Sequence, residues 1–154
     1  MKSIRMMGWT LLLLLVVTVG LAACASVGDQ ATKPPSLYQR LGGREAIALV
    51  VDDFVANVVA DDRINARFKG LQPPAVFKLK SNLADQICDA TGGPCAYLGR
   101  DMKGTHKGMN ISEAEWNATV EALVKALDKH KVPAKEKTEL LGLLGPMKAD
   151  IIGQ

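Results

Sequence analysis

The chain has 154 residues and a formal net charge of +3 at pH 7, which is enough length for one domain with a modest core. Two of its basic residues, Lys2 and Arg5, precede an apolar run that predicts a cleaved leader, and without them 17 basic residues stand against 16 acidic ones. This near balance excludes a nucleic acid as the expected partner, because nucleic-acid binding needs a clustered basic surface.

Residues 1–23 have the three-part layout of a secretory signal peptide. The basic start is followed by the apolar run Trp9–Leu21, which is shorter than the roughly 20 apolar residues that a membrane-spanning helix needs. The run ends in Leu21-Ala22-Ala23-Cys24, which resembles the lipobox of bacterial lipoproteins. An uncleaved N-terminal anchor and a coincidental cysteine are the alternatives.

The lipobox interpretation makes Cys24 the lipidated N-terminus of the mature chain. Ala25 follows it, and in Gram-negative lipoproteins the lack of an acid at this position implies sorting to the outer membrane. We therefore expect an exported protein that a lipid anchors to the bacterial outer membrane, on its periplasmic face. Residues 24–35, which end in Pro34-Pro35, predict a tether between the lipid and a domain over residues 36–154.

From Ser36 onward, apolar residues recur at spacings of three and four, which predicts an all-α domain without strands. A short apolar turn at residues 37–41 stops at Gly42-Gly43, and an amphipathic helix follows over residues 47–58. Pro73-Pro74 precedes a second stripe over residues 76–87, which the breaker at residues 91–94 ends.

Residues 94–105 show no clean period and predict an extended loop with at most one helical turn. Ser112 and Glu115 have the spacing of a capping box and predict the start of a third helix through residue 127. Pro133 suits the first turn of the last helix, and Pro146 inside that helix should kink it or remove a hydrogen bond. The sequence thus predicts four main helices around one core.

Cys88 and Cys95 are either a disulfide pair or two reduced thiols. We expect the disulfide, because an exported domain lies where disulfides persist. A metal site at these cysteines is disfavoured, since no histidine lies beside either of them.

The chain contains two histidines, His106 and His130. His130 stands among charged residues at a predicted helix C-terminus, where a histidine usually faces solvent and complements the helix dipole. His106 stands just before the capped third helix, without the partners that a zinc site or covalent haem attachment would need. A single neutral imidazole does suit haem iron, because the porphyrin supplies four nitrogens itself.

Several segments, in this order and spacing, resemble the truncated haemoglobins of group I. They are Ser36-Leu37-Tyr38 with Leu41-Gly42-Gly43, Val51-Asp52-Asp53-Phe54, Asp61-Asp62, Phe68, Thr91-Gly92-Gly93-Pro94, Tyr97, Met102-Lys103, His106 with Gly108, and Leu141-Gly142 with Leu144 and Pro146. The resemblance covers residues 36–152 and implies a truncated globin fold, a two-over-two helical sandwich around haem b.

The resemblance implies that His106 ligates the iron and that Phe68 packs on the porphyrin face. Met102 and Ile111 would line the proximal side, and the ends of Lys78, Lys80 and Tyr97 would contact the propionates. The distal positions fall on Val55, Leu79 and Leu83, where well-studied members have a tyrosine and glutamines, and the remaining distal candidates are Asn82, Gln86 and Ile87. Lys80 is also a candidate for a sixth iron ligand.

An apolar distal side offers few donors to an iron-bound oxygen, so we expect weak oxygen retention and easy autoxidation. The main hypothesis is a haem protein that binds oxygen or another diatomic gas such as nitric oxide or carbon monoxide, with an unidentified reductase. The alternatives are an envelope haem protein for electron transfer and a haem-free helical lipoprotein. The sequence leaves open whether the chain is an enzyme.

Overall fold

The computed structural model describes residues 33–154, so the predicted signal peptide and Cys24 lie outside the described residues. The helices of this region are α1 (Leu37–Arg40), α2 (Gly43–Ala60), α3 (Pro73–Ala90), α4 (Met102–His106), α5 (Glu113–Lys129) and α6 (Ala134–Leu144), with the 3-10 helices η1 (Asn65–Arg67) and η2 (Gly145–Asp150). No β-strand forms within residues 33–154, which confirms the all-α prediction. No helix in this part of the chain is long and apolar enough to cross a membrane.

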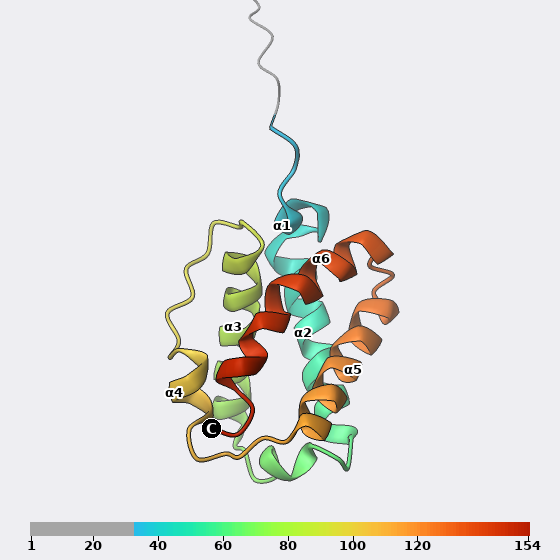
Figure 1. Ribbon diagram of the computed structural model, residues 1–154. Coiled ribbons are helices and arrows are strands. Elements are labelled where there is room, and N and C mark those ends of the chain that lie inside the picture. The colour runs from blue at the N-terminus through green and yellow to red at the C-terminus, as the bar shows by residue number, and fades with distance from the viewer. Residues whose placement is uncertain (1–32) are drawn as a thin grey trace, which may run out of the picture. The chain divides into compact units, whose positions relative to one another are not determined.

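Helix α2 lies between α3 and α5 and packs against both of them (Figure 1). The core gathers on this central helix because its apolar residues repeat with helical spacing on the buried side. The buried core side chains come from α1, α2, α3, α5 and α6, and the largest fully buried ones are Leu127, Leu140, Val51 and Cys88. The four main helices predicted from the sequence are therefore present and share one core.

The helix starts follow from short polar and proline signals. Ser112 and Glu115 form the predicted capping box at α5, in which each side chain bonds the other residue's backbone N–H. Pro73 and Pro74 occupy the first turn of α3, where a missing N–H costs no hydrogen bond. Gly42 has a φ of 91°, and a Cβ on it would lie 2.9 Å from the Ala46 Cβ, so a glycine separates α1 from α2.

The last helix differs from the prediction at both of its prolines. Pro133 is the N-cap of α6, one residue before the first turn. Pro146 does not kink the α-helix, because α6 already ends at Leu144 and the chain continues as the 3-10 helix η2. A proline fits at the start of this new helix, where no internal hydrogen bond needs its missing N–H.

The C-terminus returns to the segment that follows α4. Ile111 and Ile152 form an isolated parallel bridge. The Gly153 N–H donates to the Ile111 carbonyl at 3.0 Å, and the Asn110 N–H donates to the Gln154 carbonyl at 2.7 Å. Helix α4 also packs against η2, so the end of the chain supports the segment that carries His106.

Candidate functional site

His106 is the last residue of the short helix α4 and is half-buried. Asp101 starts this helix by accepting a hydrogen bond from the Gly104 N–H at 2.7 Å. The Nδ1 of His106 lies 2.8 Å from the Met102 carbonyl oxygen. Because a carbonyl only accepts, Nδ1 donates this hydrogen bond, and in the neutral imidazole Nε2 is then the nitrogen whose lone pair can ligate a metal.

His106 lines a cavity of about 410 Å³, a size within the range of small-molecule sites. The cavity is bounded by α2, α3, α4, α5, α6 and η2, and most of its lining is apolar. Its lining residues are Phe54, Val55, Val58, Phe68, Leu79, Leu83, Gln86, Ile87, Met102, His106, Trp116, Thr119, Val120, Leu123, Leu141, Leu144, Gly145, Met147 and Ile151.

Most of the side chains that the sequence assigned to the site gather around this cavity. Those that line it together with His106 are Phe68, Leu79, Leu83, Met102, Val55, Gln86 and Ile87. Ile111 lines a smaller neighbouring cavity of about 130 Å³, to which His106 and Phe68 also contribute. The positions on α3 share one face because residues three or four apart lie above one another on a helix.

Four further assigned residues line neither this cavity nor the smaller one beside it. The Lys80 ammonium pairs with the Asp52 carboxylate at 3.0 Å, and the Tyr97 hydroxyl donates to the Arg100 carbonyl at 2.9 Å. Lys78 is exposed and Asn82 is half-buried, and neither belongs to the lining. On α3, Lys78 and Lys80 are one residue from Leu79 and point about 100° to either side of it, whereas Asn82, three residues after Leu79, lies at the edge of the face that Leu79, Leu83 and Gln86 share.

The sequence assignment missed the wall formed by the second half of the chain. Trp116, Thr119, Val120 and Leu123 come from α5, and Leu141, Leu144, Met147 and Ile151 come from α6 and the residues after it. Nearly all of them belong to the two apolar stripes visible in the sequence, which marked buried faces without saying what those faces cover. Thr119 carried no such signal, and only the folded chain reveals its position.

Four lining side chains carry an N–H or O–H group: His106, Gln86, Thr119 and Trp116. The Gln86 amide donates to the Met102 and Met147 sulfur atoms at 3.5 and 3.4 Å. The Thr119 hydroxyl donates to the Glu115 carbonyl at 2.9 Å. The donors of Gln86, Thr119 and His106 Nδ1 are thus committed to the protein, and the indole of Trp116 is the remaining N–H.

The donor set of the cavity fits haem and not a bare metal ion. Among residues 33–154 there is no cluster of three or more His, Cys, Asp or Glu side chains that could hold an ion. A single imidazole suffices for haem iron, because the macrocycle brings four nitrogens and needs apolar and aromatic walls. Phe68 and Trp116 are aromatic residues of that wall.

His130 lies outside the cavity, at the C-cap of α5. Its Nε2 is 2.7 Å from an Asp53 carboxylate oxygen, and Lys129 binds the other oxygen at 2.6 Å. The hydrogen bond from Lys129, followed by that from His130, lowers the pKa of Asp53. His130 therefore fastens α5 to α2, whereas the sequence alone indicated a residue that faces solvent.

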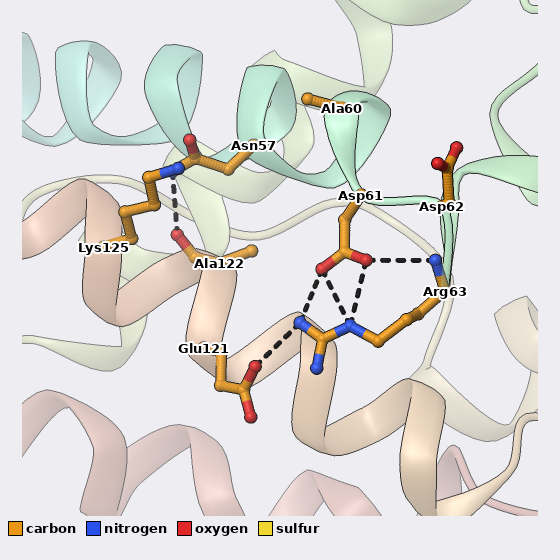
Figure 2. A pocket seen from close by; sticks show the side chains of 8 residues that line it. All are labelled: Asn57, Ala60, Asp61, Asp62, Arg63, Glu121, Ala122 and Lys125. Atoms are coloured by element: carbon orange, nitrogen blue, oxygen red, sulfur yellow. Dashed lines mark hydrogen bonds and ion pairs between the residues drawn. The ribbon is translucent and has the colours of Figure 1, made fainter.

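A second, polar pocket lies where the end of α2 meets α5 (Figure 2). The Asp61 carboxylate pairs with Arg63 at 2.6 Å, and Arg63 also reaches Glu121 on α5 at 2.7 Å. The Arg63 hydrogen bonds lower the pKa of Asp61 to about 2. These charges satisfy one another, and the cluster acts as a tie between the two helices.

The Asp61 pair predicts a specific acid sensitivity. Because the folded pKa lies below the ordinary value of 3.8, the pair contributes fully above that pH and is lost as the pH falls toward about 2. Between these limits the urea midpoint of the wild type should fall more steeply than that of Asp61→Asn. The control is Asp150→Asn, an exposed acid on η2. Parallel slopes for the wild type and Asp61→Asn would contradict the assignment.

Comparisons with known proteins agree on the architecture. The profile of the family described as bacterial-like globin matches residues 36–152. The chain is 33% identical over 119 residues to the group 1 truncated hemoglobin GlbN of Mycolicibacterium paratuberculosis, covering 77% of this chain and 85% of that protein. It is 29% identical over 122 residues to the group 1 truncated hemoglobin of Tetrahymena pyriformis, covering 79% and 98%.

Solved structures extend this similarity to three dimensions. The Fe(III) form of the Tetrahymena pyriformis truncated hemoglobin superposes with a TM-score of 0.72 at 28% identity, over 78% of this chain and all of that one. The cyanomet 2/2 hemoglobin of a Synechococcus species, which has covalently attached heme, superposes with a TM-score of 0.70 at 28% identity, over 77% and 98%. The truncated globin fold predicted from the sequence is confirmed.

Proposed function

Because the chain belongs to the bacterial-like globin family, we propose that it holds haem b in the His106 cavity and binds a diatomic gas there. The observation that carries this proposal is the environment of His106. Its Nδ1 is engaged by the Met102 carbonyl, and its Nε2 is left free on the wall of an otherwise mostly apolar cavity. An imidazole fixed in this way is the ordinary proximal ligand of globin iron.

Different residues of the cavity lining would hold different parts of the haem. His106 would ligate the iron, and Phe68, Leu79 and Leu83 would supply apolar contact to the macrocycle. When bound, haem would supply an iron centre that can bind a diatomic gas. If the protein is an enzyme, we expect it to act on nitric oxide, and a reductase would then have to keep the iron ferrous. An electron-transfer role in the envelope would use the same haem and stays a prediction.

The lipid anchor expected at Cys24 is a separate part of the proposal. It rests on the signal-like segment 1–23 and on the tetrad that ends at this cysteine. The described domain begins a short distance later, since α1 starts at Leu37. A tether of this length would keep the globin domain close to the membrane that holds the lipid.

Replacing His106 by Ala should abolish stoichiometric haem binding, because the cavity lining holds no second imidazole and no thiolate. Haem titration followed by absorption spectroscopy measures the loss. His130→Ala is the matched control, since His130 lies outside the cavity and should leave the spectrum unchanged. Adding imidazole to His106→Gly should restore a globin-like spectrum. An unchanged haem affinity in His106→Ala would refute the assignment.

Three of the four side-chain donors of the cavity are committed to the protein, and the fourth, Trp116, also lines the smaller cavity beside His106, which predicts rapid release of oxygen from the ferrous protein. Val55, which is only 4% exposed and lines the cavity, is the position at which to add a donor. Val55→Tyr should slow oxygen dissociation by about tenfold, because a hydrogen bond to a charged group contributes about 1.5 kcal/mol.

Val55→Phe adds the ring without the hydroxyl and is the control for bulk. Stopped-flow measurement of oxygen displacement gives all three rates. Equal dissociation rates for the Tyr and Phe variants would contradict the proposal that missing donors limit oxygen retention.

Cys24→Ser should move the expressed chain from the membrane fraction to the aqueous fraction, because serine cannot form the lipid thioether. Fractionation and intact-mass measurement of the wild type and the variant provide the readout. Retention of Cys24→Ser in the membrane fraction would argue against lipidation at this residue.

A further inference from the structure

His106 belongs to a segment that makes little buried contact with the rest of the domain. We call residues 94–111, which join α3 to α5 and include α4, the His106 arm. No residue of the arm is fully buried, and Leu98 is 91% exposed. Since burial of apolar surface is the main force that holds a segment in place, the arm needs other attachments.

The arm is attached at both of its ends. At its C-terminal end, Ile111 bridges to Ile152 and Asn110 donates to the Gln154 carbonyl. At its N-terminal end, Cys95 forms a disulfide with Cys88, the only covalent crosslink of the described residues, with 5.8 Å between their Cα atoms. Cys88 has an exposed fraction of 0% and lies in the core, whereas Cys95 is partly buried.

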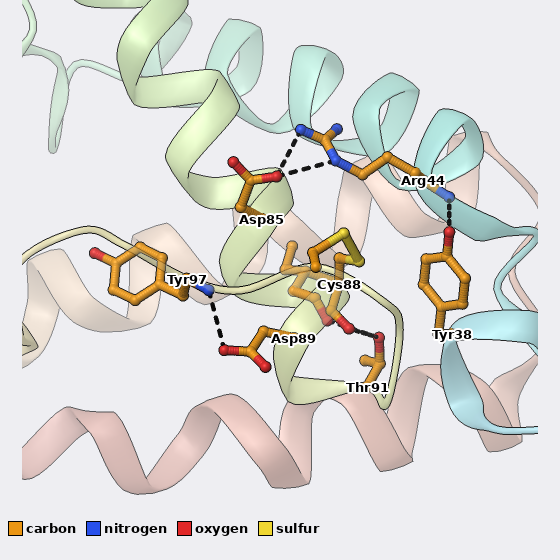
Figure 3. Close-up of a disulfide and its surroundings, with 9 residues drawn as sticks. Tyr38, Arg44, Asp85, Cys88, Asp89, Thr91 and Tyr97 are labelled. Atoms are coloured by element: carbon orange, nitrogen blue, oxygen red, sulfur yellow. Dashed lines mark hydrogen bonds and ion pairs between the residues drawn. A yellow bond between two sulfur atoms is a disulfide. The ribbon is translucent and has the colours of Figure 1, made fainter.

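Tyr38, Asp89, Thr91 and Tyr97 lie around the disulfide (Figure 3). A Cβ on Gly93 would lie 2.6 Å from the Cys88 sulfur and 2.6 Å from the Tyr38 ring, so the turn after α3 is packed directly against both. The Tyr38 hydroxyl accepts a hydrogen bond from the Arg44 N–H at 3.1 Å. The Tyr97 N–H donates to the Asp89 carboxylate at 3.1 Å, which adds a noncovalent tie beside the disulfide.

We propose that Cys88 and Cys95 are positioning residues for His106, and that firm haem retention requires their disulfide. This inference rests on the proposed haem function. The disulfide fixes the start of the arm to the rigid end of α3. Without it, the part of the arm before α4 is restrained mainly by hydrogen bonds of partly exposed groups, and α4 is held by its packing against η2. The imidazole would then sample positions away from the cavity wall.

Firm haem binding would then depend on the cellular compartment in which the chain resides. Cysteines stay reduced in the cytosol and form disulfides in the oxidising compartments to which proteins are exported. A chain that needs this bond to retain haem therefore acquires firm binding only after export, where the pair loses two electrons and two protons to an oxidant of the thiol-oxidase class.

The test compares the full-length wild type with Cys88→Ala/Cys95→Ala, both loaded with haem. Haem transfer to an excess of a haem-scavenging apoglobin measures retention, and the iron–histidine stretching band of the ferrous protein reports the imidazole. We expect haem loss to accelerate by about tenfold or more, as when supporting groups of a metal ligand are removed. We expect the band to shift or broaden.

Val51→Ala is the matched control for lost stability. Val51 is 1% exposed on α2 but lies outside both the cavity lining and the arm. This variant should unfold at a lower urea concentration while its stretching band stays that of the wild type. If the disulfide variant behaves in the same way, the bond has only a structural role and the proposal is overturned.

Hydrogen exchange of the haem-free wild type covers the case in which the double variant does not fold. A dithiol reductant converts the bond to two thiols and itself becomes a cyclic disulfide. Exchange should then rise across residues 95–111 and stay unchanged in α5, whereas a uniform rise would overturn the proposal. Failure of the oxidised wild type to take up any haem would instead refute the proposed function.

Discussion

The hydrogen bond from His106 Nδ1 to the Met102 carbonyl is the contact on which the site depends. It forms within one short helix, so it is local and needs only that α4 be made. By holding the proton on Nδ1 it leaves Nε2 as the available ligand, and it also limits rotation of the ring. The remaining architecture serves to bring this one nitrogen to the wall of an apolar cavity.

That cavity exists because α2 is packed on two sides and the C-terminal helices close the remaining wall. Val55 and Val58 contribute to it from α2, whereas Leu144 and Met147 contribute from the end of the chain. An apolar lining has two consequences for chemistry. It favours a flat hydrophobic cofactor over a bare ion, and it offers little stabilisation to a bound ligand that gathers negative charge.

Stability and function are placed in different parts of the molecule. Val51, Leu127 and Leu140 are among the most buried side chains and lie on the long helices. The histidine proposed to bind iron lies on an arm in which no residue is itself fully buried. Separating the two allows the arm to be adjusted without disturbing the core, and it makes the ligand sensitive to the arm's attachments, the disulfide among them.

The sequence by itself determined the helical class and the start of α5, and it singled out His106 as the candidate ligand. Those features depend on local chemistry: spacing of apolar residues, the Ser112 capping box, and the motifs around His106. It also identified Phe68, Leu83 and Gln86 as site residues, because the resemblance to truncated haemoglobins assigns a role to each matching position of the chain.

Tertiary structure alone decided which polar groups are free. Thr119 and Met147 reach the cavity through packing between segments distant in sequence, and Lys80 turns away from it because Asp52 on α2 offers a partner. Likewise, His130 finds Asp53 only once α5 lies against α2. Such pairings depend on the positions of two helices at once, and no single stretch of sequence contains that information.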